Sequence, residues 1–432
     1  MMDADWRGVV EADRVRARAY TDPAIFETEM ARVFDGAWVY VGHDSQVPAP
    51  GDLYATRLGR HPVVLVRAPD GAVRVLHNRC PHRGAQIVAD GFGHARVLRC
   101  AYHGWTFALD GSLRTAPLAG GYEGSGFGPG CAGTDMAPVR AAQYRGFVFA
   151  NLSGDAPPLI DWLGGVASSI DNMADRAPEG RLEVAGGVLR YLHEANWKFF
   201  VENLNDLMHP MVAHQSSSGT ARQVARAEGL DAASAPFALQ ALSPFTSDYA
   251  FFDAMGVTVF PHGHSFSGGE VSIHSAYTGV EAYDRAMDAA YGTERARAIL
   301  SVNRHNTVVY PSLTLKGAIQ TLRVIRPLAV DRTLIESWCF RLVGAPDELL
   351  YRTIEYCNLI NSHANLVGPD DHEAYRRLQA GLNGGGLEWV SHHRHPGEGT
   401  PAPEGGAAAL GTSDLVFRNQ YRAWTVAMRR GT

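Results

Sequence analysis

The segments Cys80-Pro81-His82-Arg83-Gly84 and Cys100-Ala101-Tyr102-His103-Gly104-Trp105 decide how this chain is interpreted. Each segment offers one cysteine and one histidine, and each then reaches a glycine that suits a tight turn. Thiolate and imidazole groups bind soft and borderline metal ions, so two such loops can close on one metal centre. Packing alone gives no reason to gather four such side chains in two turns.

Two kinds of metal centre fit these four residues. A structural zinc site accepts two cysteines and two histidines, but zinc fingers usually pair cysteine with cysteine and histidine with histidine. In a Rieske [2Fe–2S] centre, two histidines replace two cysteines on one of the irons. Each loop can then supply a thiolate to one iron and an imidazole to the other. The spacing therefore favours the Rieske centre.

Around these loops the sequence predicts a small all-β domain over residues 38–152. Short β-rich runs flank Asp70-Gly71 and Asp110-Gly111, and Asp-Gly between such runs predicts a hairpin. Residues 1–37 are predicted to be helical, with a cap and proline start at Thr21-Asp22-Pro23. We expect 1–37 and 153–432 to form one second domain, which makes the chain an α+β protein with an inserted β domain.

The second domain is expected to combine an antiparallel sheet with packed helices. Helices are predicted at 160–175, 195–214, 281–302, 346–364 and 415–429. Strands are predicted at 247–260, 270–277, 307–325 and 333–343. Two segments rich in small residues are predicted to be loops, either lids or plain surface segments, at 215–236 and 383–413.

A second group of candidate ligands lies in the segment 196–214. It predicts an amphipathic helix with Glu202, Asp206 and His209 on one face. On a straight helix, His209 and His214 would point roughly 140° apart. Pro210 can kink or end the helix, which would bring both imidazoles onto one ion. Alone, this spacing is weak, because the chain has 18 histidines.

Both groups resemble the Rieske oxygenase family. The two cysteine–histidine loops match its cluster motif, whereas respiratory-complex Rieske proteins carry an additional cysteine in each loop. Asn203-x-x-Asp206-x-x-His209-x₄-His214 is similar to the iron-binding helix of the family, including the preceding Asn-Trp-Lys and Glu202. One difference is that two residues separate Asn203 from Asp206, where some dioxygenases of the family have three.

The resemblance implies two cofactors. A Rieske [2Fe–2S] cluster would be held in the inserted domain by Cys80, His82, Cys100 and His103. A mononuclear Fe(II) would be held in the catalytic domain by His209, His214 and Asp371, as a facial triad of two histidines and one carboxylate. Asp370 is the alternative carboxylate, and an acidic helix start capped by these aspartates is the structural alternative.

The resemblance also implies partners. Asp206 would bridge His209 and His103 of a neighbouring subunit in a ring-shaped trimer, either a homotrimer or an α₃β₃ assembly with a small β subunit. Electrons would come from a reductase or ferredoxin. With O₂, they would hydroxylate a small aromatic substrate to a cis-dihydrodiol or, in related members, a phenol. An aromatic carboxylate is favoured, with Arg323 or Arg326 as its anchor or as an ordinary structural charge.

Several other residues have two interpretations. Six apolar residues could line the substrate pocket or belong to the core: Met208, Met211, Val212, Phe251, Phe260 and Leu313. Five histidines are expected to lie in polar loops, with metal chelation as the alternative: His262, His264, His392, His393 and His395.

The whole-chain properties agree with an enzyme. The net charge is −6, which argues against nucleic acid as a partner. No apolar run approaches the ~20 residues that cross a bilayer, and the acidic start does not resemble a signal peptide, so a cytoplasmic location is expected. Five cysteines do not suggest a disulfide framework. Two rival functions remain open: a pure Rieske electron-transfer protein, and a zinc-dependent hydrolase with a structural zinc domain.

Overall fold

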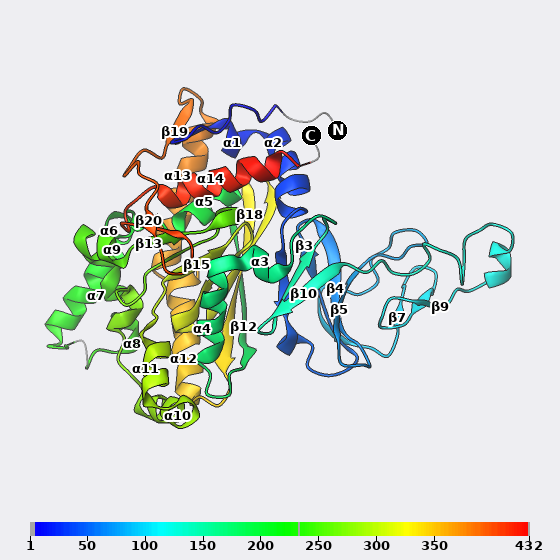
Figure 1. Ribbon diagram of the computed structural model, residues 1–432, viewed down its shortest axis with the longest axis horizontal. Coiled ribbons are helices and arrows are strands. Elements are labelled where there is room, and N and C mark those ends of the chain that lie inside the picture. Colours follow the sequence, from blue (N-terminus) through cyan, green and yellow to red (C-terminus); the bar gives the residue numbers. More distant parts are fainter. Residues whose placement is uncertain (1–4, 232–233, 431–432) are drawn as a thin grey trace. The chain divides into compact units, whose positions relative to one another are not determined.

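The computed structural model describes residues 5–231 and 234–430, and Figure 1 shows its helices and strands. The chain forms two compact units. The smaller unit is Phe34–Leu159, and the larger unit combines Met1–Val33 with Ile160–Thr432. The smaller unit is thus an insertion in the chain of the larger one. Among the described residues, no helix has both the length and the apolar character that a membrane span requires.

The smaller unit contains three antiparallel sheets, with strand orders β10-β11-β2, β5-β4-β3-β6 and β7-β8-β9. Its strands are β2 (Val39–His43), β3 (Asp52–Leu58), β4 (His61–Arg67), β5 (Val73–His77), β6 (Gly91–His94), β7 (Leu98–Arg99), β8 (Thr106–Phe107), β9 (Leu113–Thr115), β10 (Arg140–Tyr144) and β11 (Phe147–Asn151).

Both predicted Asp-Gly hairpins are confirmed. Asp70-Gly71 joins β4 to β5, and Asp110-Gly111 joins β8 to β9. The side chain of each aspartate accepts a hydrogen bond from the backbone N–H two residues later, at 3.1 and 2.9 Å. Each glycine has a positive φ, 83° at Gly71 and 94° at Gly111, which residues with a side chain rarely adopt.

The larger unit is built on a nine-stranded antiparallel sheet of order β12-β18-β17-β16-β15-β14-β13-β21-β20. Its strands are β12 (Leu182–His193), β13 (Val257–Val259), β14 (Ser265–Ser267), β15 (Asn306–Val309), β16 (Leu313–Lys316), β17 (Thr321–Ala329), β18 (Arg332–Leu342), β20 (Thr400–Pro401) and β21 (Ala407–Ala409). A separate pair joins β1 (Arg14–Arg16) to β19 (Trp389–Ser391). The predicted combination of antiparallel sheet and helices is confirmed.

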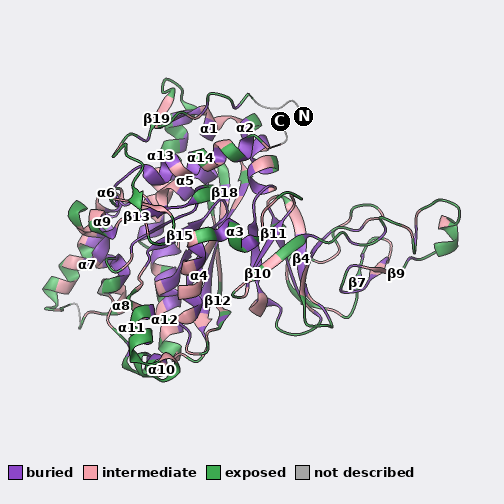
Figure 2. Ribbon diagram, in the orientation of Figure 1, coloured by how far each residue is buried: buried purple, intermediate pink, exposed green. Residues whose placement is uncertain are grey.

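Helices pack around this sheet; α12, for example, contacts β18. The α-helices are α1 (Arg18–Thr21), α2 (Pro23–Glu29), α3 (Leu159–Leu163), α4 (Ala167–Asp175), α5 (Trp197–Asn203), α6 (Pro210–Ala213), α7 (Gln215–Ala227), α8 (Phe237–Leu242), α9 (Tyr249–Met255), α10 (Glu281–Tyr291), α11 (Thr293–Ser301), α12 (Asp347–Tyr356), α13 (Val367–Asn383) and α14 (Leu415–Met428). Figure 2 shows buried residues concentrated in the sheet and along the helix faces that cover it.

The N-terminal prediction is confirmed in part. Asp22 caps α2 by accepting a hydrogen bond from the backbone N–H of Ala24 at 2.8 Å, and Pro23 opens the helix. A π-helical turn, Met30–Phe34, follows directly. The residues before α1 are not helical, because they form β1 and its turn. Residues 1–4 of the predicted helix lie outside the described residues.

Other predictions are wrong. The loop predicted at 215–236, of which 232–233 lie outside the described residues, contains α7, whose buried Ser217, Ser218 and Ala221 are small enough for close packing. In the strand predicted at 247–260, only β13 is a strand, because the first half forms α9, which Asp248 caps through the N–H of Phe251. The strand predicted at 270–277 contains a 3₁₀ turn at Ile273–Ala276. The two runs predicted as strands are short and apolar, and periodicity alone does not distinguish a strand from a buried helix in such runs.

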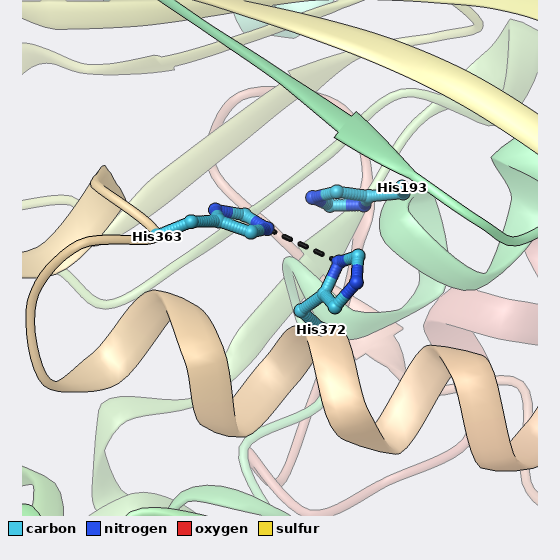
Figure 3. Close-up of side chains that lie close together, drawn as sticks. All are labelled: His193, His363 and His372. Carbon is cyan, nitrogen blue, oxygen red and sulfur yellow. Dashed lines mark hydrogen bonds between the residues drawn. The ribbon is translucent and has the colours of Figure 1, made fainter.

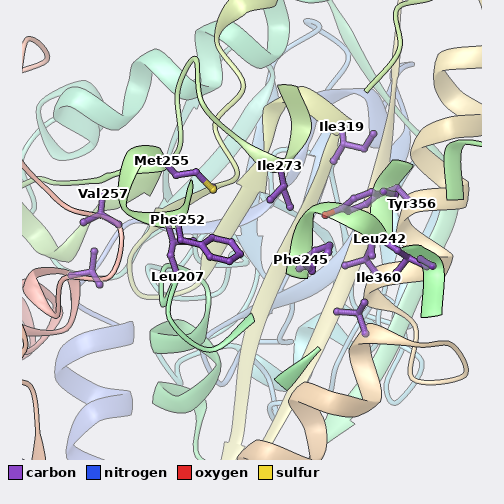
Figure 4. Packing of buried hydrophobic residues seen from close by; sticks show 14 of the residues in the cluster. Leu207, Leu242, Phe245, Phe252, Met255, Val257, Ile273, Ile319, Tyr356 and Ile360 are labelled. Carbon is purple, nitrogen blue, oxygen red and sulfur yellow. The ribbon is translucent and has the colours of Figure 1, made fainter. Parts of the chain in front are cut away.

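A large hydrophobic cluster lies in the larger unit, and Figure 4 shows part of it. It includes Leu207, Phe245, Tyr356 and Ile360, which come from segments far apart in the sequence. Phe245 also contacts the ring of His214 edge-on, with centroids 5.5 Å apart. This cluster therefore places apolar side chains directly beside one of the candidate iron ligands.

Candidate metal centres

In the smaller unit, the two loops adopt matching turns. The N–H of Gly84 donates to the carbonyl of Cys80 at 2.8 Å, and the N–H of Gly104 donates to the carbonyl of Cys100 at 3.0 Å. Both glycines have positive φ, at 78° and 72°. The two turns therefore share this closing hydrogen bond, although His82 is the third residue of its turn and His103 is the fourth.

The four candidate cluster ligands lie together. The thiols of Cys80 and Cys100 are both buried, and the rings of His82 and His103 have centroids 4.7 Å apart. Burial and the neighbouring Cys100 thiol raise the pKa of Cys80. Two buried thiols this close resist ionisation unless a cation compensates for the charge, so the pair suits a metal cluster.

The surroundings of the histidines fit a cluster as well. His82 Nδ1 is buried and has no hydrogen-bond partner among the described residues, which leaves it available as a ligand atom. The ring of His82 stacks on Trp105, with centroids 5.0 Å apart and planes 1° apart. Trp105 is buried, whereas Tyr102 is 63% exposed although its ring lies against His103, with centroids 3.7 Å apart.

In the larger unit, the segment predicted as one helix over 195–214 is two helices. Asn196 caps α5 by accepting from the N–H of Lys198, and α5 ends at Asn203. Asp206 then accepts from the N–H of Met208 at 2.9 Å, a local turn that competes with helix. Pro210 opens α6 at its first position. The proline thus starts a helix after the break rather than causing it.

Glu202 does not share a face with Asp206 and His209 as predicted. Its carboxylate accepts hydrogen bonds from the hydroxyls of Tyr20 at 2.8 Å and Tyr421 at 2.9 Å. Burial raises the pKa of Glu202 to about 7. Glu202 therefore ties α5 to the N- and C-terminal helices instead of joining the metal centre.

The break between α5 and α6 brings His209 and His214 together with Asp371, from the first turns of α13. One ligand atom from each of these three lies within 4.8 Å of the others. The Nε2 atoms of His209 and His214 lie 3.6 and 3.5 Å from the same oxygen, Asp371 Oδ1. This is the ligand set of two histidines and one carboxylate that holds Fe(II) in non-haem oxygenases.

One further aspartate orients a ligand. His214 Nδ1 lies 3.2 Å from Asp370 Oδ2, and a tautomer that donates its Nδ1–H there presents the Nε2 lone pair to a metal. His209 Nδ1 lies 3.8 Å from Asp206 Oδ2, beyond a hydrogen bond, and has no hydrogen-bond partner among the described residues. Although burial lowers the pKa of His214, the charges of Asp371 and Asp370 raise it overall. The centre therefore attracts positive charge.

Asn203 also faces this centre. Its Nδ2 lies 3.2 Å from His209 Nε2 and donates to Asp371 Oδ1 at 3.1 Å. The shorter spacing between Asn203 and Asp206 therefore does not remove Asn203 from the group.

Other expected residues lie elsewhere. Met211 and Phe251 pack against the hydrophobic cluster beside His214, but Val212 is 66% exposed and Met208 is 37% exposed. Phe260 and Leu313 are buried core residues outside that cluster. His264 and His392 lie in loop segments but are buried. Among the residues that the structure describes, none of the histidines at 262, 264, 392, 393 and 395 belongs to a group of three potential metal ligands.

The sequence did not single out two groups that the structure brings to light. Lys316, at the end of β16, is buried near Asp371 and His214. His193, His363 and His372 form a second set of three potential ligands. No local motif joins either group, since their members meet only through the fold.

Comparison with known families now defines the class. Residues 37–123 match a Rieske [2Fe-2S] domain, and residues 181–400 match the catalytic domain of the ring hydroxylating alpha subunit. The chain belongs to the ring-hydroxylating alpha-subunit family. It is an oxygenase that carries a Rieske [2Fe–2S] cluster and a mononuclear iron, and the four cysteine and histidine residues and the three ligands above fit these groups.

Particular relatives can be named. The chain is 34% identical to the toluate 1,2-dioxygenase alpha subunit of Pseudomonas putida, over 88% of this chain and 81% of the relative. It is 30% identical to the 2-halobenzoate 1,2-dioxygenase large subunit of Burkholderia cepacia, over 97% and 90%. A naphthalene 1,2-dioxygenase structure from Rhodococcus sp. superposes with a TM-score of 0.76 at 25% identity, covering 97% of this chain and 95% of that one.

Proposed function

We propose that Cys80, His82, Cys100 and His103 hold the cluster, and that His209, His214 and Asp371 hold the iron. The convergence of two Nε2 atoms on Asp371 Oδ1 supports the second assignment. When bound, the cluster transfers electrons and the iron activates O₂ for insertion into an aromatic ring. The chain positions these groups, and Asp370 orients His214 through its Nδ1.

The proposed substrate is an aromatic carboxylate of the benzoate class, and the product is its cis-dihydrodiol. One observation carries this proposal: Lys316 is only 3% exposed, and its ammonium group donates to the hydroxyl of Tyr356 at 2.9 Å. No carboxylate forms an ion pair with Lys316 in the described part of the chain. A buried cation usually has a counter-charge, and a substrate carboxylate would supply it.

The position of Lys316 agrees with this role. Burial lowers the pKa of Lys316 well below its ordinary value, and the adjacent Arg323 lowers it further, which disfavours the charged form; a substrate carboxylate at Lys316 would favour that form again. The negative charge of Asp371 raises the pKa of Lys316. Lys316 therefore lies close enough to this proposed iron ligand to interact with it electrostatically. A benzoate held by Lys316 would present its ring toward the iron-binding residues and the hydrophobic cluster.

The two arginines anticipated as anchors differ. Arg326 donates to Glu336 at 2.6 Å, so its charge is already paired. Arg323 donates to the amide oxygen of Asn306 at 3.0 Å and lies over the ring of Phe200. Arg323 also lacks an ion pair within residues 5–231 and 234–430. Arg323 is therefore the second cation proposed to face the carboxylate.

The relatives agree with this substrate class. Three of the similar curated proteins are named for toluate, 2-halobenzoate and anthranilate, which are all aromatic carboxylates. Others, about as similar to this chain as the second and third of these, are named for biphenyl and benzene. Sequence similarity alone does not separate the two groups, and the unpaired lysine favours the carboxylates.

Replacing Lys316 tests the proposal. Lys316→Met keeps the length of the side chain and removes its charge. We expect KM for benzoate or a toluate to rise at least about tenfold, while KM for toluene changes little, because a charge contact contributes only to the carboxylate. Steady-state kinetics with dihydrodiol detection measures both values.

A matched variant controls for a general loss of charge. Arg332→Gln removes an exposed cation from β18 of the same sheet and should leave both KM values unchanged. Equal effects of Lys316→Met on benzoate and toluene would contradict the carboxylate anchor. Turnover of neutral aromatics alone by the wild-type enzyme would contradict the substrate class while leaving the oxygenase assignment intact.

We also propose the partners of this enzyme. A reductase or ferredoxin supplies electrons, and the alpha subunit forms a ring-shaped trimer, alone or with a small β subunit. Asp206 supports this arrangement, because its carboxylate is 27% exposed while it faces His209. An exposed carboxylate in this position can also accept a hydrogen bond from a histidine of another subunit.

A further inference from the structure

Three histidines meet in the larger unit outside the iron-binding residues. His193 is the last residue of β12, His363 precedes α13, and His372 lies on α13. One ring nitrogen from each lies within 4.8 Å of the others. Figure 3 shows the three rings turned toward one shared space from these separate elements. The chain thus gathers three imidazoles from positions far apart in the sequence.

Hydrogen bonds among these residues do not explain why the three imidazoles lie together. His363 Nε2 lies 3.2 Å from His372 Nδ1, and one hydrogen bond joins them. His193 Nδ1 is buried and has no hydrogen-bond partner among the described residues. His193 as a whole is 3% exposed. Leaving this nitrogen unsatisfied is costly, and binding a cation through its lone pair would remove that cost.

Aromatic side chains surround His193 and His363. The ring of His193 contacts Phe200 and Tyr375, with centroids 5.3 and 5.0 Å away, and Tyr191 lies 4.5 Å from His363. Burial lowers the pKa of His193 well below its ordinary value. At neutral pH this ring therefore carries a lone pair rather than a second proton, as a metal ligand must.

The ligand set selects a class of cation. Three imidazoles without a carboxylate suit borderline ions such as zinc and do not suit magnesium or calcium, which prefer oxygen ligands. In a tetrahedral zinc site with Zn–N bonds of 2.0–2.1 Å, two nitrogens lie about 3.3 Å apart. The separation of 3.2 Å between His363 Nε2 and His372 Nδ1 matches this spacing.

The geometry points to a second metal site, in which His193, His363 and His372 bind one zinc-like divalent cation apart from the iron. The site ties the end of β12 to α13 and to the segment before it. α13 also carries Asp370 and Asp371 near its start. The cation would therefore brace the helix that supplies the carboxylate proposed for the iron.

Zinc titration of the iron-loaded protein tests this site. We expect calorimetry to show one zinc ion bound per chain while the iron and sulfide contents stay constant. His363→Gln and His372→Gln should each weaken zinc binding by about tenfold or more, because each removes one ligand. His393→Gln, which changes an exposed histidine elsewhere, should bind zinc as the wild type does.

Cobalt provides a second readout that does not depend on activity. The wild type should show the visible absorption of a nitrogen-coordinated Co²⁺ ion, and both glutamine variants should lose it. Zinc uptake that is the same in the wild type and in both variants would overturn the proposal. Zinc uptake matched by an equal loss of iron would overturn it too, because the cation would then occupy the catalytic centre.

Discussion

Neighbouring aspartates at the start of α13 face the same histidine from different sides. Asp371 Oδ1 lies 3.5 Å from His214 Nε2, whereas Asp370 Oδ2 lies 3.2 Å from His214 Nδ1. An imidazole uses one nitrogen for a metal and the other for an orienting hydrogen bond. This geometry agrees with the prediction that Asp371 is the ligand, and it gives Asp370, the alternative, a proposed orienting role.

Replacing each aspartate by asparagine should separate these roles. Asp371→Asn should lose the mononuclear iron while keeping the iron and sulfide of the cluster, because it removes the only charged ligand of the set. Asp370→Asn should keep most of its iron, with affinity lower by about tenfold, since an amide oxygen still accepts from His214 Nδ1. Metal analysis of both purified variants measures this, and the reverse pattern would make Asp370 the ligand.

Lys316 and His193 show what sequence alone does not reveal at this scale. The cluster loops are short motifs, so the nearness of their ligands follows from spacing. Lys316 and His193 carry no local motif, and their importance depends on burial and on partners from distant segments. The pairing of Arg326 with Glu336, which removes Arg326 as an anchor, likewise depends on strand register.

At the scale of elements, a buried glutamate joins three helices of the larger unit. Glu29 at the end of α2 accepts from Lys198 Nζ at 2.6 Å and from Trp197 Nε1 at 2.9 Å, both on α5. It also accepts from Trp424 Nε1 on α14 at 2.7 Å. Because α5 leads into the segment proposed to bind iron, this contact holds the start of that segment in place.

Removing the charge of Glu29 should destabilise the larger unit. Glu29→Gln leaves the ammonium group of Lys198, 5% exposed, without its counter-charge, and breaking a buried pair costs about 3–5 kcal/mol. Urea unfolding followed by tryptophan fluorescence measures the loss. Glu348→Gln, which removes an exposed partner of Arg352, should cost at most about 1 kcal/mol. Similar losses in both variants would contradict the importance of the buried contact.

Prediction from sequence succeeds at this scale where short-range rules act. The Asp-Gly turns correctly predict the hairpins, and Asp22-Pro23 correctly predicts the start of α2. Prediction fails where burial, rather than local sequence, determines the conformation. β12 was not anticipated, because its residues alternate weakly and gain their order by pairing with β18. The break after α5 was misplaced because it arises from the polar segment that contains Asp206, not from Pro210.

At the scale of the whole molecule, the proposed cluster ligands and iron ligands lie in different compact units of the chain. Asp206 is partly exposed beside His209, and His103 is partly exposed on its loop. Both can therefore meet residues of another subunit. In a closed ring with head-to-tail contacts, each iron would receive electrons from the cluster of its neighbour.

Mixed trimers test this arrangement. His82→Ala removes a cluster ligand and Asp371→Ala removes an iron ligand, so each variant alone should be inactive. If electrons cross between subunits, an equal mixture of co-expressed variants should recover about a quarter of wild-type activity. Half of the irons are intact, and the cluster of the neighbouring subunit is intact for half of these, because the variants assemble into rings at random. One quarter of the iron–cluster pairs are therefore complete. Activity should be measured after native mass spectrometry confirms mixed trimers. Mixed trimers without activity would place electron transfer within a single chain.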